Sequence, residues 1–156
     1  MQTITPLLAA HPFFKGLSEP QLDQLSHQAM PIEFPAGQII FREGELANRF
    51  YLLLEGEVAL ESPSRTDGGG ATRVQTLGAG DVLGWSWLIP PHFWRFDARA
   101  VKPTQSIFIY GTRVRELCEE DHTLGYELMK RTTAVLIERL QATRRQLLKQ
   151  AGTPSP

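Results

Sequence analysis

Residues 80–100 read Gly80-Asp81-Val82-Leu83-Gly84-Trp85-Ser86-Trp87-Leu88-Ile89-Pro90-Pro91-His92-Phe93-Trp94-Arg95-Phe96-Asp97-Ala98-Arg99-Ala100. The glycines at 80 and 84 predict a tight turn after a strand, then a short helical turn, a loop and another strand. This layout is typical of a loop that wraps a phosphate group with backbone amides. All three tryptophans of the chain lie in this stretch. We name residues 78–99 the cassette, and its contents decide which ligand the fold can hold.

The chain around the cassette, from 32 to 110, is patterned as short strands separated by turns. Short apolar runs bounded by glycine or proline occur at 39–41, 50–54, 58–61, 74–77, 98–101 and 106–110. Alternation in the third run predicts a half-exposed strand with Ala59 and Glu61 facing solvent. The segment 62–71, with three consecutive glycines, is expected to be a flexible hairpin tip. The pattern favours an antiparallel β-roll, a jelly-roll-like double-stranded β-helix.

Residues 1–31 are expected to form N-terminal helices. The second helix begins at Ser18, and Gln21 is placed to complete a capping box with it. Pro31 is expected to end this helix, because proline disrupts a helix interior.

Residues 112–150 are expected to form two C-terminal helices, the longer one capped by Asp121. The longer helix carries a heptad seam of the kind that pairs with a second copy or packs against the protein's own roll. The seam residues are Tyr126, Met129, Thr133, Leu136, Leu140, Thr143 and Leu147. We expect a homodimer through this seam, and a frayed tail over 151–156. The whole chain, 1–156, is expected to be a single domain, mainly β with flanking helices.

The composition is that of an ordinary globular protein. With 16 basic and 17 acidic residues the net charge is −1, so no general attraction to nucleic acid or membranes is expected. No segment approaches the roughly 20 apolar residues of a membrane span, and the start at Met1 lacks a signal-peptide pattern. The single cysteine, Cys118, excludes an internal disulfide and favours a reducing compartment. We therefore expect a cytoplasmic location.

Four motifs occur in order along the chain: His11-Pro12-Phe13-Phe14-Lys15-Gly16-Leu17-Ser18, Phe41-Arg42-Glu43-Gly44-Glu45, Phe50-Tyr51-Leu52-Leu53-Leu54-Glu55-Gly56-Glu57-Val58 and Gly78-Ala79-Gly80-Asp81-Val82-Leu83-Gly84. Together they resemble the cyclic-nucleotide-binding domain of the Crp/Fnr type. The resemblance extends over residues 10–150 and implies an eight-stranded β-roll whose long C-terminal helix serves as dimer contact and ligand lid. Regulators of this type carry a helix-turn-helix domain after that helix. This chain stops there, so a stand-alone domain without direct DNA binding is expected.

The resemblance also implies a nucleotide site that this cassette matches poorly. Nucleotide-binding members have a glutamate for the ribose directly after the Gly-x-x-Gly turn, where this chain has Trp85. An indole cannot accept two hydrogen bonds from a sugar. The position of the phosphate-binding arginine falls on Arg95 when counted from Gly80. It falls on Phe96 when counted back from the strand, which is the alignment we favour because strand alternation is harder to shift than loop length.

Asp97 also opposes a nucleotide, because it is expected where phosphate oxygens approach. Two like charges about 4 Å apart repel by about 1 kcal/mol in water and about 4 kcal/mol in a partly screened pocket. Arg95 or Arg99 could neutralise Asp97, but an arginine so occupied serves the phosphate less well. Ordinary binding of cyclic AMP or cyclic GMP is therefore not expected.

Aromatic rings replace the missing nucleotide contacts. Either they grip a flat or apolar effector by stacking, or they fill the cavity as a second core, or they form an exposed protein contact. The candidate binding residues are Gly84, Trp85, Ser86, Trp87, Trp94, Arg95, Phe96, Asp97, Ala98 and Arg99. The sequence leaves these three alternatives open.

Other chemistry is weakly indicated. His92 is a candidate axial haem ligand, but a lone loop histidine is usually solvated, so no haem and no other cofactor or metal is expected. No catalytic motif is present, so an enzyme is not expected. The last charges are all basic, which suits the negative end of a helix. They are Arg139, Arg144, Arg145 and Lys149.

These observations predict a regulatory or sensor module that responds to an effector other than a common cyclic nucleotide, or to a protein partner. A cyclic-nucleotide receptor with a divergent pocket is the first alternative. A structural adaptor without a small ligand is the second.

Overall fold

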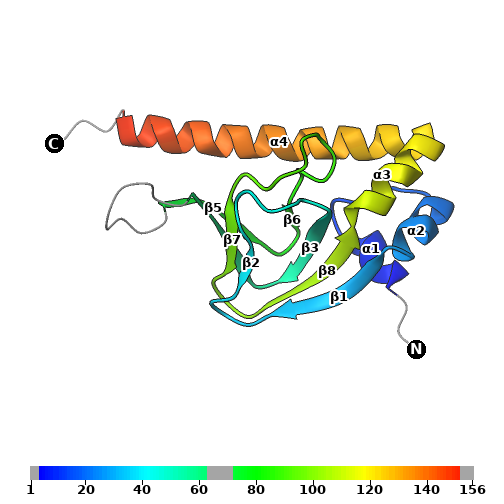
Figure 1. Cartoon of the computed structure of the whole chain (residues 1–156), viewed down its shortest axis with the longest axis horizontal. Coiled ribbons are helices and arrows are strands. Elements are labelled where there is room, and N and C mark those ends of the chain that lie inside the picture. The colour runs from blue at the N-terminus through cyan, green and yellow to red at the C-terminus, as the bar shows by residue number, and fades with distance from the viewer. Residues whose placement is uncertain (1–3, 63–71, 152–156) are drawn as a thin grey trace.

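Two antiparallel sheets of four strands each form the predicted β-roll in the computed structural model, which describes residues 4–62 and 72–151 (Figure 1). The strand order is β1-β8-β3-β6 in one sheet and β2-β7-β4-β5 in the other. The strands are β1 (Ala29–Phe34), β2 (Ile39–Phe41), β3 (Arg49–Glu55), β4 (Glu57–Ser62), β5 (Thr72–Gly78), β6 (Val82–Leu83), β7 (Asp97–Ala100) and β8 (Thr104–Tyr110). The expected hairpin tip and tail lie outside the described residues, apart from Ser62 and the backbone of Ala151.

Helices cover one end and one side of the roll. They are α1 (Thr5–Ala10), α2 (Glu19–Ser26), α3 (Gly111–Glu120) and α4 (His122–Ala151). Figure 1 shows α1, α2 and α3 together at one end, while α4 runs across the roll and reaches over β5. At 1.5 Å per residue, α4 is about 45 Å long. The capping box of Ser18 with Gln21 is present, and Asp121 Oδ1 accepts the amide of Thr123 at 3.1 Å. Both predicted helix starts are therefore confirmed.

The end of the second helix was predicted wrongly. Pro31 does not terminate it, because α2 already ends at Ser26 and Pro31 lies within β1, opposite Ile107 of β8. β1 is an edge strand, and an edge tolerates a proline because one of its sides has no strand partner.

The predicted half-exposed strand is in fact buried on both faces. In β4, Ala59 is fully buried and Glu61 is nearly so. β4 lies inside its sheet, and Ala59 is flanked in register by Thr76 of β5 and Arg99 of β7. Directly opposite residues stand on the same face, so these longer side chains cover Ala59.

Two apolar clusters hold the molecule together, and the cassette contributes a tryptophan to each. Trp87 belongs to the cluster between the roll and the helices, where its ring stacks on Phe50 with centroids 4.7 Å apart. Trp94 belongs to the cluster inside the roll. The cassette is therefore fixed at both tryptophans and is not a loosely attached loop.

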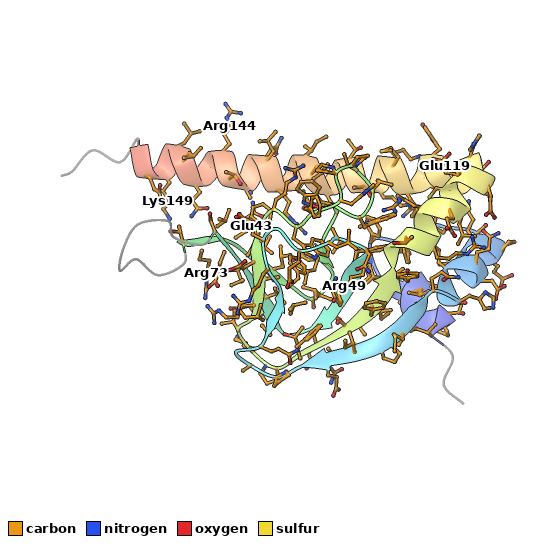
Figure 2. All side chains as sticks on the ribbon, viewed as in Figure 1. Glu43, Arg49, Arg73, Glu119, Arg144 and Lys149 are labelled. Atoms are coloured by element: carbon orange, nitrogen blue, oxygen red, sulfur yellow. The ribbon has the colours of Figure 1, made fainter. Side chains whose placement is uncertain are left out.

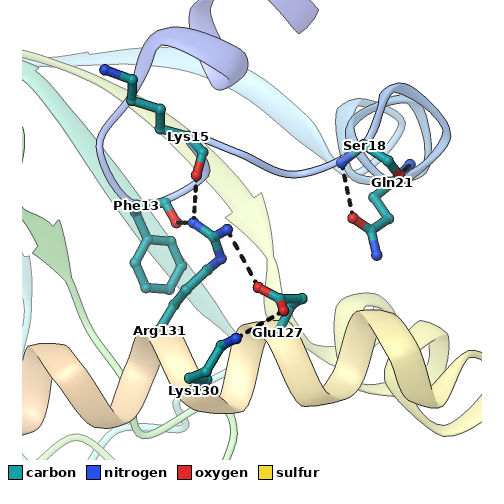
Figure 3. A network of polar contacts seen from close by, with 7 residues as sticks. All are labelled: Phe13, Lys15, Ser18, Gln21, Glu127, Lys130 and Arg131. Carbon is teal, nitrogen blue, oxygen red and sulfur yellow. Dashed lines mark hydrogen bonds and ion pairs between the residues drawn. The ribbon is translucent and has the colours of Figure 1, made fainter.

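The first half of α4 is anchored to the rest of the fold. Leu124 and Leu128 are fully buried. Arg131 donates from Nη1 to the carbonyl oxygens of Phe13 at 2.8 Å and Lys15 at 2.9 Å, and Nη2 lies 3.4 Å from Glu127 (Figure 3). These contacts join α4 to the segment between α1 and α2.

Candidate functional site

The turn that opens the cassette is fixed by hydrogen bonds to β3. The amide of Gly80 donates to the carbonyl of Leu53, and the amide of Leu53 donates to the carbonyl of Asp81, both at 2.9 Å. The carboxylate of Asp81 accepts the amide of Gly78 at 2.8 Å. After β6, the amide of Leu88 closes a single turn on the carbonyl of Trp85 at 3.2 Å. The expected glycine turn is present at the mouth of the roll.

The space beside this turn is filled by Trp94. Its side chain is 3% exposed and stacks on Phe41 with centroids 3.8 Å apart and planes 8° apart. The guanidinium of Arg49 lies 5.5 Å from the centroid of this indole. A Cβ on Gly84 would come within 2.8 Å of the far edge of the indole, so the ring lies directly against the glycine turn.

The void that remains at the cassette is very small. About 10 Å³ is free, which is room for about one water molecule. Its lining includes six of the ten candidate residues: Gly84, Trp85, Ser86, Trp94, Arg95 and Phe96. A site for a small organic ligand usually has at least about 300 Å³. The geometry therefore favours the alternative in which the rings fill the cavity.

The other four candidate residues lie elsewhere. Trp87 is in the helix-side core, with its carbonyl accepting a hydrogen bond from Arg115. Ala98 is fully buried inside the roll. Asp97 and Arg99 are half-buried on β7 and do not line the void.

Among the described residues, neither Arg95 nor Arg99 forms the ion pair with Asp97 that the sequence allows. Asp97 accepts the backbone amide of Glu43 at 2.8 Å, which ties β7 to the turn after β2. Arg99 instead pairs with Glu61 at 2.6 Å, and this guanidinium lowers the pKa of the Glu61 carboxyl. Both side chains thus form contacts within the roll.

Four residues that line the void are not among the candidates: Phe41, Leu60, Leu83 and Arg139. The charged one, Arg139, belongs to α4. It was expected on a solvated basic face, yet it lines the void and donates from Nη2 to the carbonyl of Val82. Burial lowers the pKa of its guanidinium. The sequence does indicate that Arg139 faces away from the dimer seam, because it lies one position before the seam residue Leu140.

Two further observations concern metal ions and membranes. Within residues 4–62 and 72–151, no group of three or more His, Cys, Asp or Glu side chains is arranged to hold a metal ion. His92 has a left-handed backbone, and its Nε2 is buried without a partner. None of the helices in these same ranges is both long and apolar enough to cross a membrane.

Sequence comparison places residues 31–121 in the cyclic nucleotide-binding domain family. The CRP-like cAMP-activated global transcriptional regulator of Mycobacterium tuberculosis is 23% identical over 141 residues, which cover 90% of this chain and 60% of the regulator. The chain thus spans less than two thirds of that relative.

Two solved structures extend the comparison. A candidate cyclic nucleotide-binding protein of Geobacter metallireducens is 34% identical, with a TM-score of 0.79, and the match covers 90% of this chain and 99% of that protein. The regulatory subunit of a cAMP-independent protein kinase A from Trypanosoma brucei is 27% identical, with a TM-score of 0.67 and coverage of 85% and 46%.

Proposed function

The chain belongs to the cyclic nucleotide-binding domain family, and we propose that it is a regulatory module whose nucleotide pocket is closed by its own side chains. Domains of this family are typically non-catalytic, and we propose the same for this chain. Its signal would then come from an effector or partner other than cyclic AMP or cyclic GMP.

The observation that carries this proposal is the position of Trp94. The indole lies on Phe41 and against Gly84, and about 10 Å³ remains free beside it. A nucleotide could enter only if Trp94 left the core, and exposing a buried tryptophan costs several kcal/mol. The Trypanosoma relative is the regulatory subunit of a cAMP-independent protein kinase A, which supports a signal other than cyclic AMP.

We also propose a homodimer through α4. Four of the seven predicted seam residues are large, apolar and exposed: Tyr126 at 65%, Met129 at 46%, Leu140 at 68% and Leu147 at 61%. Ile137 and Leu148, which the seam omitted, are exposed by 51% and 59% and broaden the face. An apolar face along a helix of this length favours pairing with a second copy.

Not every seam residue faces outward. Thr133 is exposed, but Leu136 and Thr143 are half-buried, and Thr143 accepts a hydrogen bond from Gln75 of β5. The dimer contact is therefore centred on the exposed residues.

A protein partner at the rim of the cassette is the second candidate for the signal. Leu46 and Phe93 form an isolated β-bridge there and are 57% and 47% exposed, with Ile89 exposed by 42%. Exposed aromatic and aliphatic side chains of this kind serve as interface anchors. Location in the cytoplasm is part of the proposal, because a chain with a single cysteine, Cys118, suits a reducing compartment.

The experiment that tests the closed pocket is a designed opening. The double variant Trp85→Glu/Trp94→Arg supplies a ribose acceptor and a phosphate cation where the rings now lie. We expect it to bind cyclic AMP at least about tenfold more tightly than the wild type in calorimetry. The matched control is Trp85→Glu/Phe93→Arg, which adds the same charges but places the arginine on an exposed neighbour. A folded double variant without any gain would instead support the adaptor alternative.

A further inference from the structure

A much larger cleft lies next to the start of the cassette and shares Arg139 with the cassette void. It has a volume of about 670 Å³ and runs between α4 and β5. The turn Gly80–Asp81 forms its floor, and Pro12 and Phe13 line it from the N-terminal segment. This volume is in the range of sites that hold small organic ligands.

The walls of the cleft combine apolar surface with cations. Val74 and Leu77 contribute from β5, and Val135 and Ala142 contribute from α4. Three arginines of α4 line the same space: Arg131, Arg139 and Arg145.

The three arginines differ in how well they are satisfied. Arg131 is held by Phe13, Lys15 and Glu127, as Figure 3 shows. Arg139 donates to a backbone carbonyl. Arg145 makes no hydrogen bond or ion pair with any residue that the structure describes.

Two carboxylates also line the cleft, but they leave Arg145 without a counter-ion. Asp81 accepts the amide of Gly78 and lies in the field of Arg139. Glu138 is exposed on α4 beside Arg139 and also acts on that guanidinium. The charge left over in the cleft is positive, and it lies next to apolar wall.

We propose that this cleft binds a small amphipathic anion, a molecule with an apolar or aromatic body and one carboxylate or phosphate group. The anion pairs with Arg145, and the body lies between β5 and the Val135–Ala142 face of α4. Such a ligand is the effector of the proposed regulatory module, so the inference rests on that proposed function.

The position of the cleft also gives a route for the signal. Among the described residues, side-chain hydrogen bonds between β5 and α4 come from Gln75, which donates to the carbonyl of Arg139 at 2.8 Å and to Thr143 at 3.1 Å. Arg139 lines both the cleft and the cassette void. A ligand between β5 and α4 therefore changes the seating of the helix whose opposite face is the proposed dimer contact.

The test is calorimetric titration of the full chain with 1-naphthyl phosphate, with 1-naphthoate, 1-naphthol and inorganic phosphate as partial probes. We expect saturable binding of naphthyl phosphate with a Kd below about 1 mM. Phosphate alone and naphthol alone should bind at least about tenfold more weakly, because each lacks one half of the recognition. Comparison of naphthyl phosphate with naphthoate tells which anion the cleft prefers.

Two variants place the probe in the cleft. Arg145→Gln removes the unpaired cation, and Ala142→Trp fills the apolar wall. Each should weaken naphthyl phosphate about tenfold or more. The matched control is Arg144→Gln, because Arg144 is the adjacent arginine and points away from the roll in Figure 2. Its affinity should equal that of the wild type.

The proposal is overturned if naphthyl phosphate fails to bind, or if it binds equally to wild type, Arg145→Gln and Ala142→Trp. An equal loss in Arg144→Gln also overturns it, because the effect would then be general charge. The proposed function is contradicted by a different result, which is micromolar binding of cyclic AMP to the wild type. The two outcomes can therefore be told apart.

Discussion

The indole of Trp94 lies parallel to the ring of Phe41, with centroids 3.8 Å apart and planes 8° apart. Phe41 is the last residue of β2. Trp94 lies in the cassette, three residues before β7, and β7 pairs with β2. The stack therefore joins the cassette to β2, and in the proposed function it occupies the space of a nucleotide.

Gly84→Ala tests how firmly Trp94 is held. Gly84 and Gly44 have nearly the same left-handed φ, +95° and +91°, so alanine is strained equally at both. At Gly84 the new Cβ would lie 2.8 Å from the indole, whereas at Gly44 nothing lies within 4 Å. We expect Gly84→Ala to lower the free energy of unfolding by about 1–3 kcal/mol more than Gly44→Ala, measured by urea denaturation.

The double variant Gly84→Ala/Trp94→Leu is the control, because it removes the ring that the new Cβ would meet. The added cost of alanine at Gly84 should fall to that at Gly44. If Gly84→Ala and Gly44→Ala cost the same in the wild-type background, the indole does not fill the pocket as described.

Leu140→Lys tests the α4 dimer. A lysine in an apolar contact leaves a buried charge unpaired. The dissociation constant of the dimer should therefore rise at least about tenfold. Sedimentation equilibrium measures the change. Gln146→Lys adds the same charge to an exposed residue on the cleft side of α4 and should leave the dimer intact. A monomeric wild type at about 100 μM would contradict this part of the proposal.

Arg131→Lys tests the anchor between α4 and the N-terminal segment. A lysine ammonium cannot reproduce the fork that reaches two carbonyls and Glu127. We expect a loss of about 1–3 kcal/mol in the free energy of unfolding. Lys130→Gln, which removes the exposed pair of Lys130 with Glu127 and its contact over the ring of Tyr126, should cost less than about 1 kcal/mol. Equal losses in both variants would show that the fork adds nothing.

His11 should make stability depend on pH. Its Nε2 lies 3.2 Å from the carbonyl of Leu53, and its Nδ1 accepts the amide of Phe13. Burial lowers its pKa below the ordinary 6.5, so the unfolded chain binds the proton at a higher pH than the folded chain does. The stabilisation is therefore complete above about pH 6.5 and is lost as the pH falls through the folded-state pKa.

His11→Gln is the matched variant, because its amide can donate and accept without titrating. Burial also lowers the pKa of His92, which acts in the same direction in both proteins. The melting temperature of the wild type should therefore fall more between pH 7.5 and pH 5 than that of His11→Gln. Parallel curves would exclude a role for His11.

The roll could be predicted because glycine turns punctuate the strands, and the four motifs stand in a recognisable order. The sequence prediction was wrong where the pattern of a strand does not reveal which neighbouring strands cover its side chains. Ala59 was assigned to solvent because it alternates with Val58, yet Thr76 and Arg99 lie over it. The sequence predicts a helix stop at Pro31, because only the sheet order shows that an edge strand can hold this proline.

The site was less predictable for the same reason. An aromatic cassette is compatible with rings that line a pocket and with rings that fill it. The choice depends on Phe41, which lies far upstream in the chain and reaches Trp94 only in the folded roll. The partner of Asp97 is likewise a backbone amide of Glu43, which side-chain reasoning cannot find.

The most direct test of the closed pocket is titration of the wild-type protein with cyclic AMP and cyclic GMP, followed by tryptophan fluorescence and calorimetry. All three tryptophans lie in the cassette, so the emission reports on that segment alone. A closed pocket predicts no saturable heat and no spectral change up to about 1 mM nucleotide. Saturable binding at micromolar nucleotide, with a shift in emission, would contradict it and make this chain a cyclic-nucleotide receptor.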